Sequence, residues 1–233
     1  MASFSNLLQT TVGRKILTGV TGIFLTLFLV AHLAGNLSLF AGDGGEAFNL
    51  YAVFLHDLGP LLWIAEIILI ILFALHAYLG IKIYLGKKKA RPVDYSYYKS
   101  QGGPSKQNLA SKTMLISGSV ILLFVILHVL HFKYNFFMPQ MTVANPGGGE
   151  MIDLAGHVEQ AFLNPWITLA YTAVMLLIGV HLKHGVWSAF ISLGAKNPKL
   201  VPLLYTVGGI VAALLAVGFL IIPVFIFFNG GLL

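Results

Sequence analysis

Residues 114–137 read MLISGSVILLFVILHVLHFKYNFF, an apolar run with a single charged residue, Lys133, close to its end. A helix needs roughly 20 apolar residues, at about 1.5 Å rise each, to cross the hydrocarbon core of a bilayer. Four further stretches meet this requirement: 16–40, 58–85, 166–193 and 201–228. Glycine, proline and asparagine, which favour turns and end helices, occur between the runs, at 42–45, 86–92, 147–149 and 197–198. The pattern predicts an all-α integral membrane protein in which residues 1–233 form a single bundle of five transmembrane helices.

The composition supports a membrane protein. Of the 233 residues, 58% are hydrophobic and only 9% are charged, whereas soluble domains carry about 25% charged residues. The chain has no cysteine, which excludes disulfides, iron–sulfur clusters held by this chain and covalent haem attachment. The net charge of +6 comes from basic residues in the loops between apolar runs. Because they form no binding face, we expect the lipid bilayer as a partner and no nucleic acid.

The basic residues are distributed very unevenly between the two sides of the predicted bundle. Of the 14, only Lys133 falls on one side. The others fall on the opposite side: Arg14, Lys15, Lys82, Lys87, Lys88, Lys89, Arg91, Lys99, Lys106, Lys112, Lys183, Lys196 and Lys199. Since cytoplasmic loops are enriched in Lys and Arg, this distribution predicts a cytoplasmic N-terminus and an outer C-terminus.

Each of the first four runs carries a histidine that can be assigned a depth from this topology. His32 and His128 fall in the outer half of the membrane, and His76 and His181 fall in the inner half. Ionisable residues inside spans are costly and usually functional. Two facing imidazoles at one depth can be the axial ligands of a haem held between helices. The pattern therefore predicts two haems b, an outer one on His32 and His128 and an inner one on His76 and His181.

Zinc is the main alternative for such histidine pairs. A zinc site needs three or four ligands in one place, often with thiolate or carboxylate help. Cysteine is absent, and Glu66, the only acid inside a span, lies nearly three turns from His76. The ligand set therefore favours haem.

Several glycines in the spans could provide a groove for a flat macrocycle. Gly19, Gly22 and Gly35 lie in the first run, and Gly80 and Gly185 each follow a predicted ligand by four residues. Ordinary packing of small residues between helices would explain the same glycines. Both interpretations stay open at this point.

The remaining histidines have weaker assignments. His131, one turn after His128, could replace it as a ligand. His184, three residues after His181, would contact a haem propionate, a quinone headgroup or water. His56 and His157 are interpreted as solvated histidines near span ends, although His56 and Asp57 together could exchange protons at the outer surface.

Short motifs in four spans resemble one known family. They are RKILTG (14–19) with LVAH (29–32), LHAYLG (75–80), SG (117–118) with LHV (127–129), and HLKHGVWS (181–188). In this order they are similar to the cytochrome b subunit of succinate:quinone oxidoreductases, of the five-span, two-haem type that also serves menaquinol:fumarate reductases. The resemblance covers the whole chain, and the family pairs the first with the third histidine and the second with the fourth.

The resemblance implies a function. The chain would be the membrane-anchor subunit of such an enzyme in the bacterial cytoplasmic membrane, with no substrate site of its own beyond the quinone site. A flavoprotein and an iron–sulfur protein would dock on its cytoplasmic face and exchange electrons through the haems with quinone, often menaquinone. The family uses an acid near the outer end of the second span at its quinone site, for which Asp57 is the first candidate and Glu66 the second.

Two other functions stay open on the sequence. One is the haem b subunit of another quinone-linked enzyme, such as a hydrogenase or nitrate reductase, although the order of the histidines argues against it. The other is a transporter that uses histidines as a proton or metal relay without haem. A transporter should show inverted repeats and broken helices, but no repeat is evident and only Pro223 lies deep in a span.

Overall fold

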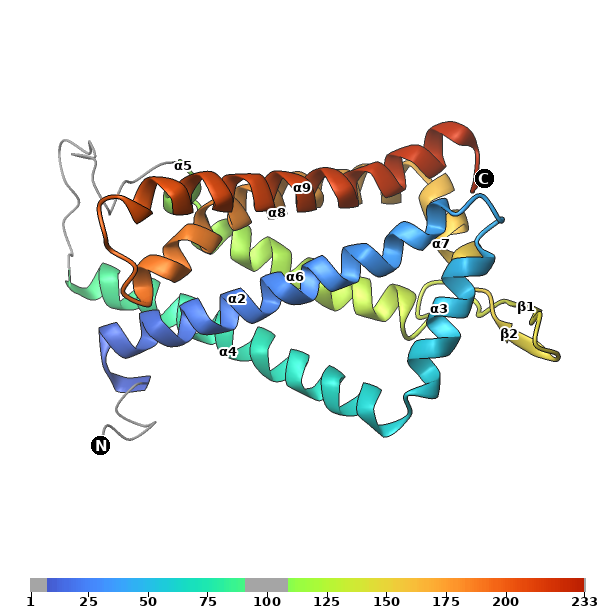
Figure 1. The fold of residues 1–233 in the computed structure, drawn as a ribbon, viewed down its shortest axis with the longest axis horizontal. Helices are drawn as coiled ribbons and strands as arrows, with labels where there is room; N and C mark the ends of the chain where they lie inside the picture. Colours follow the sequence, from blue (N-terminus) through green and yellow to red (C-terminus); the bar gives the residue numbers. More distant parts are fainter. Residues whose placement is uncertain (1–7, 91–108, 233) are drawn as a thin grey trace. The chain divides into compact units, whose positions relative to one another are not determined.

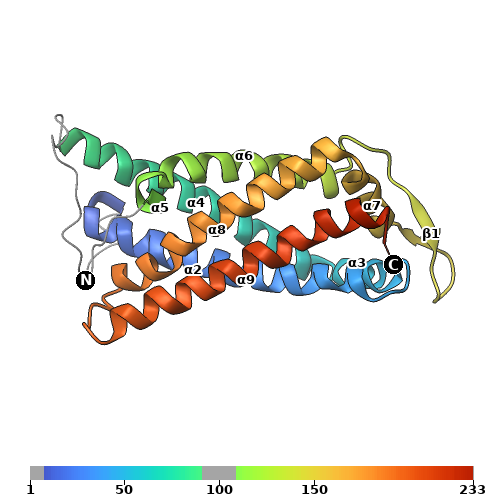
Figure 2. The same cartoon turned by 90° about the horizontal axis from the view of Figure 1, so that it is seen from above.

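The computed structural model describes residues 8–90 and 109–232. Its five long helices are α2 (Thr11–Asn36), α4 (Pro60–Ala90), α6 (Met114–Phe132), α8 (Pro165–Ser192) and α9 (Leu200–Asn229) (Figures 1 and 2). Each is long and apolar enough to cross a membrane. The predicted all-α membrane fold with five spanning helices is therefore confirmed.

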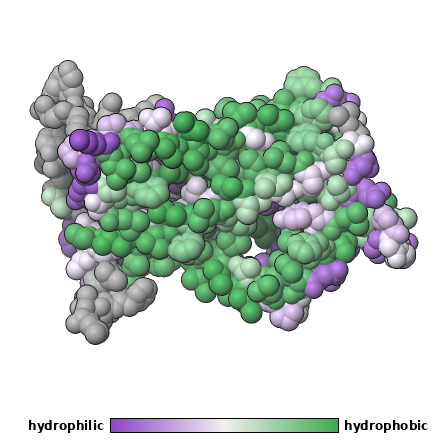
Figure 3. All heavy atoms as spheres, in the orientation of Figure 1, coloured by the Kyte–Doolittle hydropathy of each residue, from purple (hydrophilic) through white to green (hydrophobic). Residues whose placement is uncertain are grey.

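Large apolar side chains lie exposed along these helices. Examples are Trp63, Ile70, Leu214 and Phe228, whose exposed fractions are 68%, 67%, 67% and 80%. Figure 3 shows the resulting apolar surface along the spanning helices. Such a surface is stable only where lipid replaces water, so the chain is a multi-pass membrane protein.

Three helices have a boundary about five residues from the predicted one. Helix α2 begins at Thr11, whereas the first run was expected to begin at 16. Helix α4 continues through Gly86 to Ala90, so the expected break at Gly86 is wrong. Helix α6 ends at Phe132, five residues before the expected end at 137. The backbone N–H groups of Lys133 and Tyr134 share the Val129 carbonyl oxygen, and Asn135 adopts a left-handed conformation with φ of 49°. Asparagine tolerates this conformation, which ends a helix.

Four further elements form where the sequence predicted loops. They are α3 (Glu46–Asp57), the strands β1 (Thr142–Ala144) and β2 (Glu150–Ile152), and α7 (Leu154–Leu163). The two strands pair antiparallel, with Val143 opposite Met151. Two shorter pieces complete the described chain, the 3-10 helix η1 (Leu37–Phe40) and α5 (Leu109–Lys112).

An asparagine connects α3 to α7. The Asn49 side-chain amide donates to the Asp153 carboxylate at 2.9 Å and accepts from the Ala155 backbone N–H at 2.8 Å. Asp153 also caps α7 by accepting from the Gly156 N–H. Next to this polar network lies an apolar core made of Leu39, Phe48, Ala155, Val158, Phe162, Ile222 and Ile226.

The chain divides into two compact units. Unit 1 comprises Met1–Phe28, Leu69–Val120 and Leu177–Leu214, and unit 2 comprises Leu29–Ile68, Ile121–Leu176 and Leu215–Leu233. Each spanning helix contributes residues to both units. His76 and His181 belong to unit 1, whereas His32 and His128 belong to unit 2. Each histidine pair predicted from the sequence therefore lies within a single unit.

Candidate functional site

In unit 1, His76 and His181 each form a hydrogen bond with a hydroxyl on a neighbouring helix. The Nδ1 atom of His76 on α4 lies 3.1 Å from the Oγ1 atom of Thr21 on α2. The Nδ1 atom of His181 on α8 lies 3.0 Å from the Oγ atom of Ser117 on α6. Thr21 and Ser117 are both buried.

The hydroxyl contacts allow the same tautomer in both imidazoles, with the proton on Nδ1. Each hydroxyl has one proton, and a backbone carbonyl of its own helix lies within reach: Leu17 at 2.9 Å from Thr21 and Met114 at 3.2 Å from Ser117. When that proton goes to the carbonyl, the hydroxyl oxygen accepts from the imidazole Nδ1–H. The Nε2 atom then carries the free lone pair, which is the state that a metal ligand needs.

A glycine follows each of these hydroxyl residues and makes room for the same imidazole. A Cβ atom added to Gly22 would lie 3.2 Å from the Cε1 atom of His76. One added to Gly118 would lie 3.4 Å from the Cε1 atom of His181. A hydroxyl residue followed by a glycine therefore lies against each ring, Thr21-Gly22 on α2 and Ser117-Gly118 on α6, with the tighter approach at Gly22.

The other predicted groove glycines divide into two kinds. A Cβ atom on Gly19 would lie 3.1 Å from the Ala189 carbonyl oxygen, so this glycine allows α2 and α8 to pack closely. At Gly80 and Gly185 an added Cβ would meet no heavy atom of the described residues within 4 Å. Open space therefore exists one turn after His76 and one turn after His181, as a groove for a macrocycle requires.

In unit 2, the rings of His32 on α2 and His128 on α6 lie side by side in an edge-on arrangement. Their centroids are 5.9 Å apart and their planes make an angle of 84°. Imidazole nitrogen binds metals at about 2 Å, and the ring centre lies about 1 Å behind the nitrogen. Two imidazoles that bind one metal ion from opposite sides would therefore have centroids about 6 Å apart, and the spacing of this pair is compatible with that.

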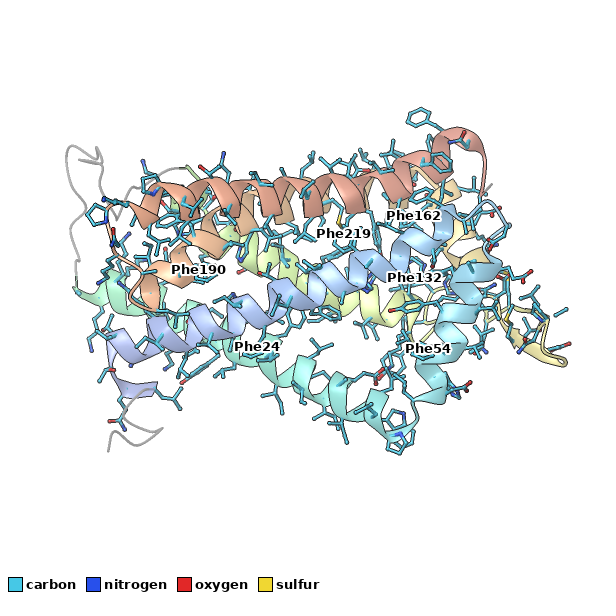
Figure 4. The ribbon with its side chains drawn as sticks, in the orientation of Figure 1. Phe24, Phe54, Phe132, Phe162, Phe190 and Phe219 are labelled. Atoms are coloured by element: carbon cyan, nitrogen blue, oxygen red, sulfur yellow. The ribbon has the colours of Figure 1, made fainter. Side chains whose placement is uncertain are left out.

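Aromatic and polar side chains surround the His32–His128 pair. Phe219 on α9 lies 5.8 Å from the His32 ring, and Phe124 stacks on His128 at 5.6 Å; Figure 4 labels Phe219. The Tyr171 hydroxyl lies 3.3 Å from the Nδ1 atom of His128. The Asn36 amide donates to the His32 carbonyl oxygen at 2.7 Å and lies 3.5 Å from its Nδ1 atom. Aromatic rings therefore line the His32–His128 pair, and a polar side chain lies next to the Nδ1 atom of each histidine.

His131, the alternative ligand, is directed toward a different neighbour. It is buried, its ring lies 5.4 Å from that of His157 on α7, and its Nε2 atom lies 3.4 Å from the Met138 sulfur. The structure therefore favours His128 as the partner of His32. His157 is also buried rather than solvated, so the expectation of a solvated loop histidine is wrong. His157 lies on the short helix α7, which the sequence did not reveal and which packs against the end of α6.

His184 lies in unit 1 beside an aromatic cluster. Its ring makes an edge contact with Trp187 at 5.0 Å, and Trp187 lies 4.2 Å from Tyr205. The His184 Nδ1 atom is buried without a hydrogen-bond partner among the described residues. A buried donor or acceptor of this kind normally has a partner, so His184 is available to a propionate or a quinone headgroup.

The two candidate acids occupy different environments. The side chain of Asp57 is 72% exposed and lies 3.8 Å from the exposed His56 ring. Glu66 is half-buried within α4 and forms an ion pair with Lys133, which follows α6. An ionisable group within a spanning helix is a stronger functional candidate than a solvated one, so the structure favours Glu66 over Asp57.

The hydrogen-bond partners of the histidines were not predicted as site residues. Thr21, Asn36 and Tyr171 had no assigned role, and Ser117 entered only as part of a motif. A usable signal was present, because Thr-Gly and Ser-Gly pairs occur in two of the spans.

Within the described part of the chain, no three residues among His, Cys, Asp and Glu converge to form a metal site. The described residues therefore do not bring together the three or four such ligands that a tetrahedral zinc site needs. In the comparisons with known proteins, no family model, curated protein or solved structure matches this chain.

Proposed function

We propose that this chain is the dihaem cytochrome b membrane-anchor subunit of a succinate dehydrogenase of the succinate:menaquinone type or of a fumarate reductase. In this role it passes electrons between a cytoplasmic flavoprotein and iron–sulfur pair and quinone in the membrane. One observation carries the proposal. Two histidine pairs come from four spanning helices, each pair lies within its own unit, and each Nδ1 atom has a polar contact.

The chain's residues have defined roles in this proposal. Bound haem supplies one-electron transfer. His32 and His128 hold one haem, and His76 and His181 hold the other. Thr21 and Ser117 orient the imidazoles of the second pair. With two histidine ligands for each haem, these sites would serve electron transfer rather than oxygen binding.

The alternative functions receive less support. A histidine-relay transporter would need helices broken near the middle of the membrane, whereas among the described residues each span is one continuous helix and only Pro223 interrupts a helix interior. Another quinone-linked haem b subunit would use the same ligand chemistry. The family resemblance favours the succinate or fumarate enzyme, because Ser117-Gly118 belongs to the motifs that carry it and also holds His181.

Glu66 is the proposed quinone-site acid, since it is the acid within a spanning helix and belongs to the same unit as the His32–His128 pair. The proposed docking face for the soluble subunits begins at the basic end of α4, with Lys87, Lys88 and Lys89. Arg91, Lys99 and Lys106, which extend this basic run, lie outside the described residues. The charge distribution supports a cytoplasmic location of this face in a bacterial membrane.

The test is an optical spectrum of the purified full chain, reduced minus oxidised. We expect two low-spin haems b per chain. His76→Ala or His181→Ala should remove one or convert it to high spin, and His32→Ala or His128→Ala should do the same to the other. His56→Ala is the matched control and should keep both haems. His56 is exposed and lies on α3, away in sequence from all four predicted ligands.

A wild-type chain without haem would refute the proposal, and wild-type haem content in any of the four variants would remove that residue from the ligand set. Isolation of the native complex tests the enzyme class. A flavoprotein and an iron–sulfur subunit should copurify and catalyse succinate-dependent quinone reduction. Copurification of a hydrogenase or nitrate reductase subunit instead would favour the alternative.

A further inference from the structure

Unit 2 contains a second group of metal-binding side chains that the proposed function does not use. His131 in the last turn of α6, Met138 in the segment after it and His157 on α7 form this group, named here the His131–Met138–His157 cluster. The two histidines are 6% and 2% exposed. The Nε2 atom of His157 is buried without a hydrogen-bond partner among the described residues.

The spacing within the cluster matches that of ligands around one metal ion. The Nε2 atom of His131 lies 3.4 Å from the Met138 sulfur. With metal–nitrogen and metal–sulfur bonds of about 2.0 and 2.3 Å, two ligands at a tetrahedral or trigonal angle lie roughly 3.5 Å apart. The His131 and His157 ring centroids are 5.4 Å apart. Two imidazoles on one trigonal metal have centroids roughly 5 Å apart, by the same bond lengths.

The donor types select the metal. Two imidazoles and a thioether form a soft, neutral ligand set that suits Cu(I). A zinc site would need further nitrogen, thiolate or carboxylate ligands, and no third His, Cys, Asp or Glu of the described residues joins the two histidines. Phe132 stacks on His131 at 4.4 Å, and Phe137 makes an edge contact at 5.6 Å. This apolar wall penalises a divalent charge more than a monovalent one.

We propose that the His131–Met138–His157 cluster binds one Cu(I) ion through the two Nε2 atoms and the Met138 sulfur. The ion gives the buried His157 nitrogen its partner and connects the end of α6 to α7. Because binding selects the folded state, Cu(I) stabilises this connection. The site does not depend on haem or on the proposed function.

The test uses the full chain in detergent, with any affinity tag removed because tags bind copper. Cu(I) is added under reducing conditions in competition with the chromogenic chelator bicinchoninate. We expect one Cu(I) per chain to be taken from the chelator. His157→Gln and Met138→Leu should each weaken binding by more than the roughly 10- to 100-fold that an outer-shell partner contributes. Haem content, measured in the same samples, should stay at its wild-type level.

The matched controls are His56→Gln, at an exposed histidine, and Met141→Leu, at a methionine outside the cluster; both should bind as the wild type does. Met138→Leu keeps the side-chain volume nearly constant. This variant therefore tests Cu(I) binding by the cluster even when His157→Gln does not fold. Failure of the wild-type chain to take Cu(I) from the chelator would overturn the proposal. Undiminished binding by Met138→Leu, or displacement of Cu(I) by equimolar Zn²⁺, would overturn it as well.

Discussion

Replacing Thr21 by valine tests the assigned role of the hydroxyl at His76. Valine keeps the branched shape of threonine but has no oxygen to accept the proton from the His76 Nδ1 atom at 3.1 Å. The change removes one neutral hydrogen bond, which is worth about 0.5–1.5 kcal/mol. The imidazole becomes a less basic ligand, which stabilises the oxidised iron less. The reduction potential of the haem on His76 and His181 should therefore rise.

The size of the shift follows from the same energy. For a one-electron couple, about 1.4 kcal/mol corresponds to about 59 mV. The lost hydrogen bond therefore corresponds to a rise of about 20–60 mV. Ser117→Ala should raise the same potential by a similar amount, because Ser117 makes the equivalent contact with His181 at 3.0 Å.

The assay is a redox titration followed by optical spectroscopy, with the haem on His32 and His128 as an internal reference that should not shift. Thr26→Val is the matched control, since the Thr26 hydroxyl on the same helix donates to the Gly22 carbonyl at 2.8 Å. Nitrogen NMR of the haem-free protein should show a protonated Nδ1 atom in His76. Unshifted potentials in both Thr21→Val and Ser117→Ala with haem still bound, or an equal shift in Thr26→Val, would refute the tautomer with the proton on Nδ1.

Three further predictions concern topology, the acids and pH. A reporter inserted at Gly148, in the β1–β2 turn, should be active only outside the cytoplasm and one at Asn197, between α8 and α9, only inside; the reverse at both positions would invert the orientation. Glu66→Gln should slow quinone turnover by roughly 100-fold or more, as loss of an acid–base group does, with both haem spectra intact, whereas Asp57→Asn should change it little because that carboxylate is exposed; equal effects would remove the distinction between the two acids. Burial lowers the pKa of His157 below its usual 6.5, so the folded state binds a proton at this histidine less readily than the unfolded state. The contribution of His157 to the free energy of unfolding is therefore fully present above about pH 6.5 and is lost as the pH falls. The protection factors of the amides in α7, which packs beside His131 of α6, should therefore fall between pH 7 and 5 after correction for the intrinsic pH dependence of exchange, and fall less in His157→Phe; the same fall in that variant would assign the effect to another group.

The number and type of the spanning elements follow from the sequence alone. Apolar length is a local property of each run, because any stretch of about 20 apolar residues must satisfy its own backbone hydrogen bonds in lipid. The grouping of His32 with His128 and His76 with His181 was also predictable, since depth depends only on counting residues along a helix whose direction is known. The structure places each of these pairs within one compact unit.

The rotation of each helix about its axis is decided only by tertiary packing, and the site depends on it. Gly19 and Gly22 lie three residues apart on α2, yet one meets Ala189 of α8 and the other meets His76 of α4. Nothing in the sequence distinguishes these two glycines. Nor does it distinguish Thr21, which contacts His76, from Thr26, which bonds only to a carbonyl of its own helix among the described residues. A helix that faces lipid on most sides is apolar all round, so its sequence has little helical periodicity. The sequence therefore does not indicate which side of the helix packs against a neighbouring helix. The contacts that hold the imidazoles, and the burial of His157 of α7 against His131 of α6, therefore come from packing between segments far apart in the chain.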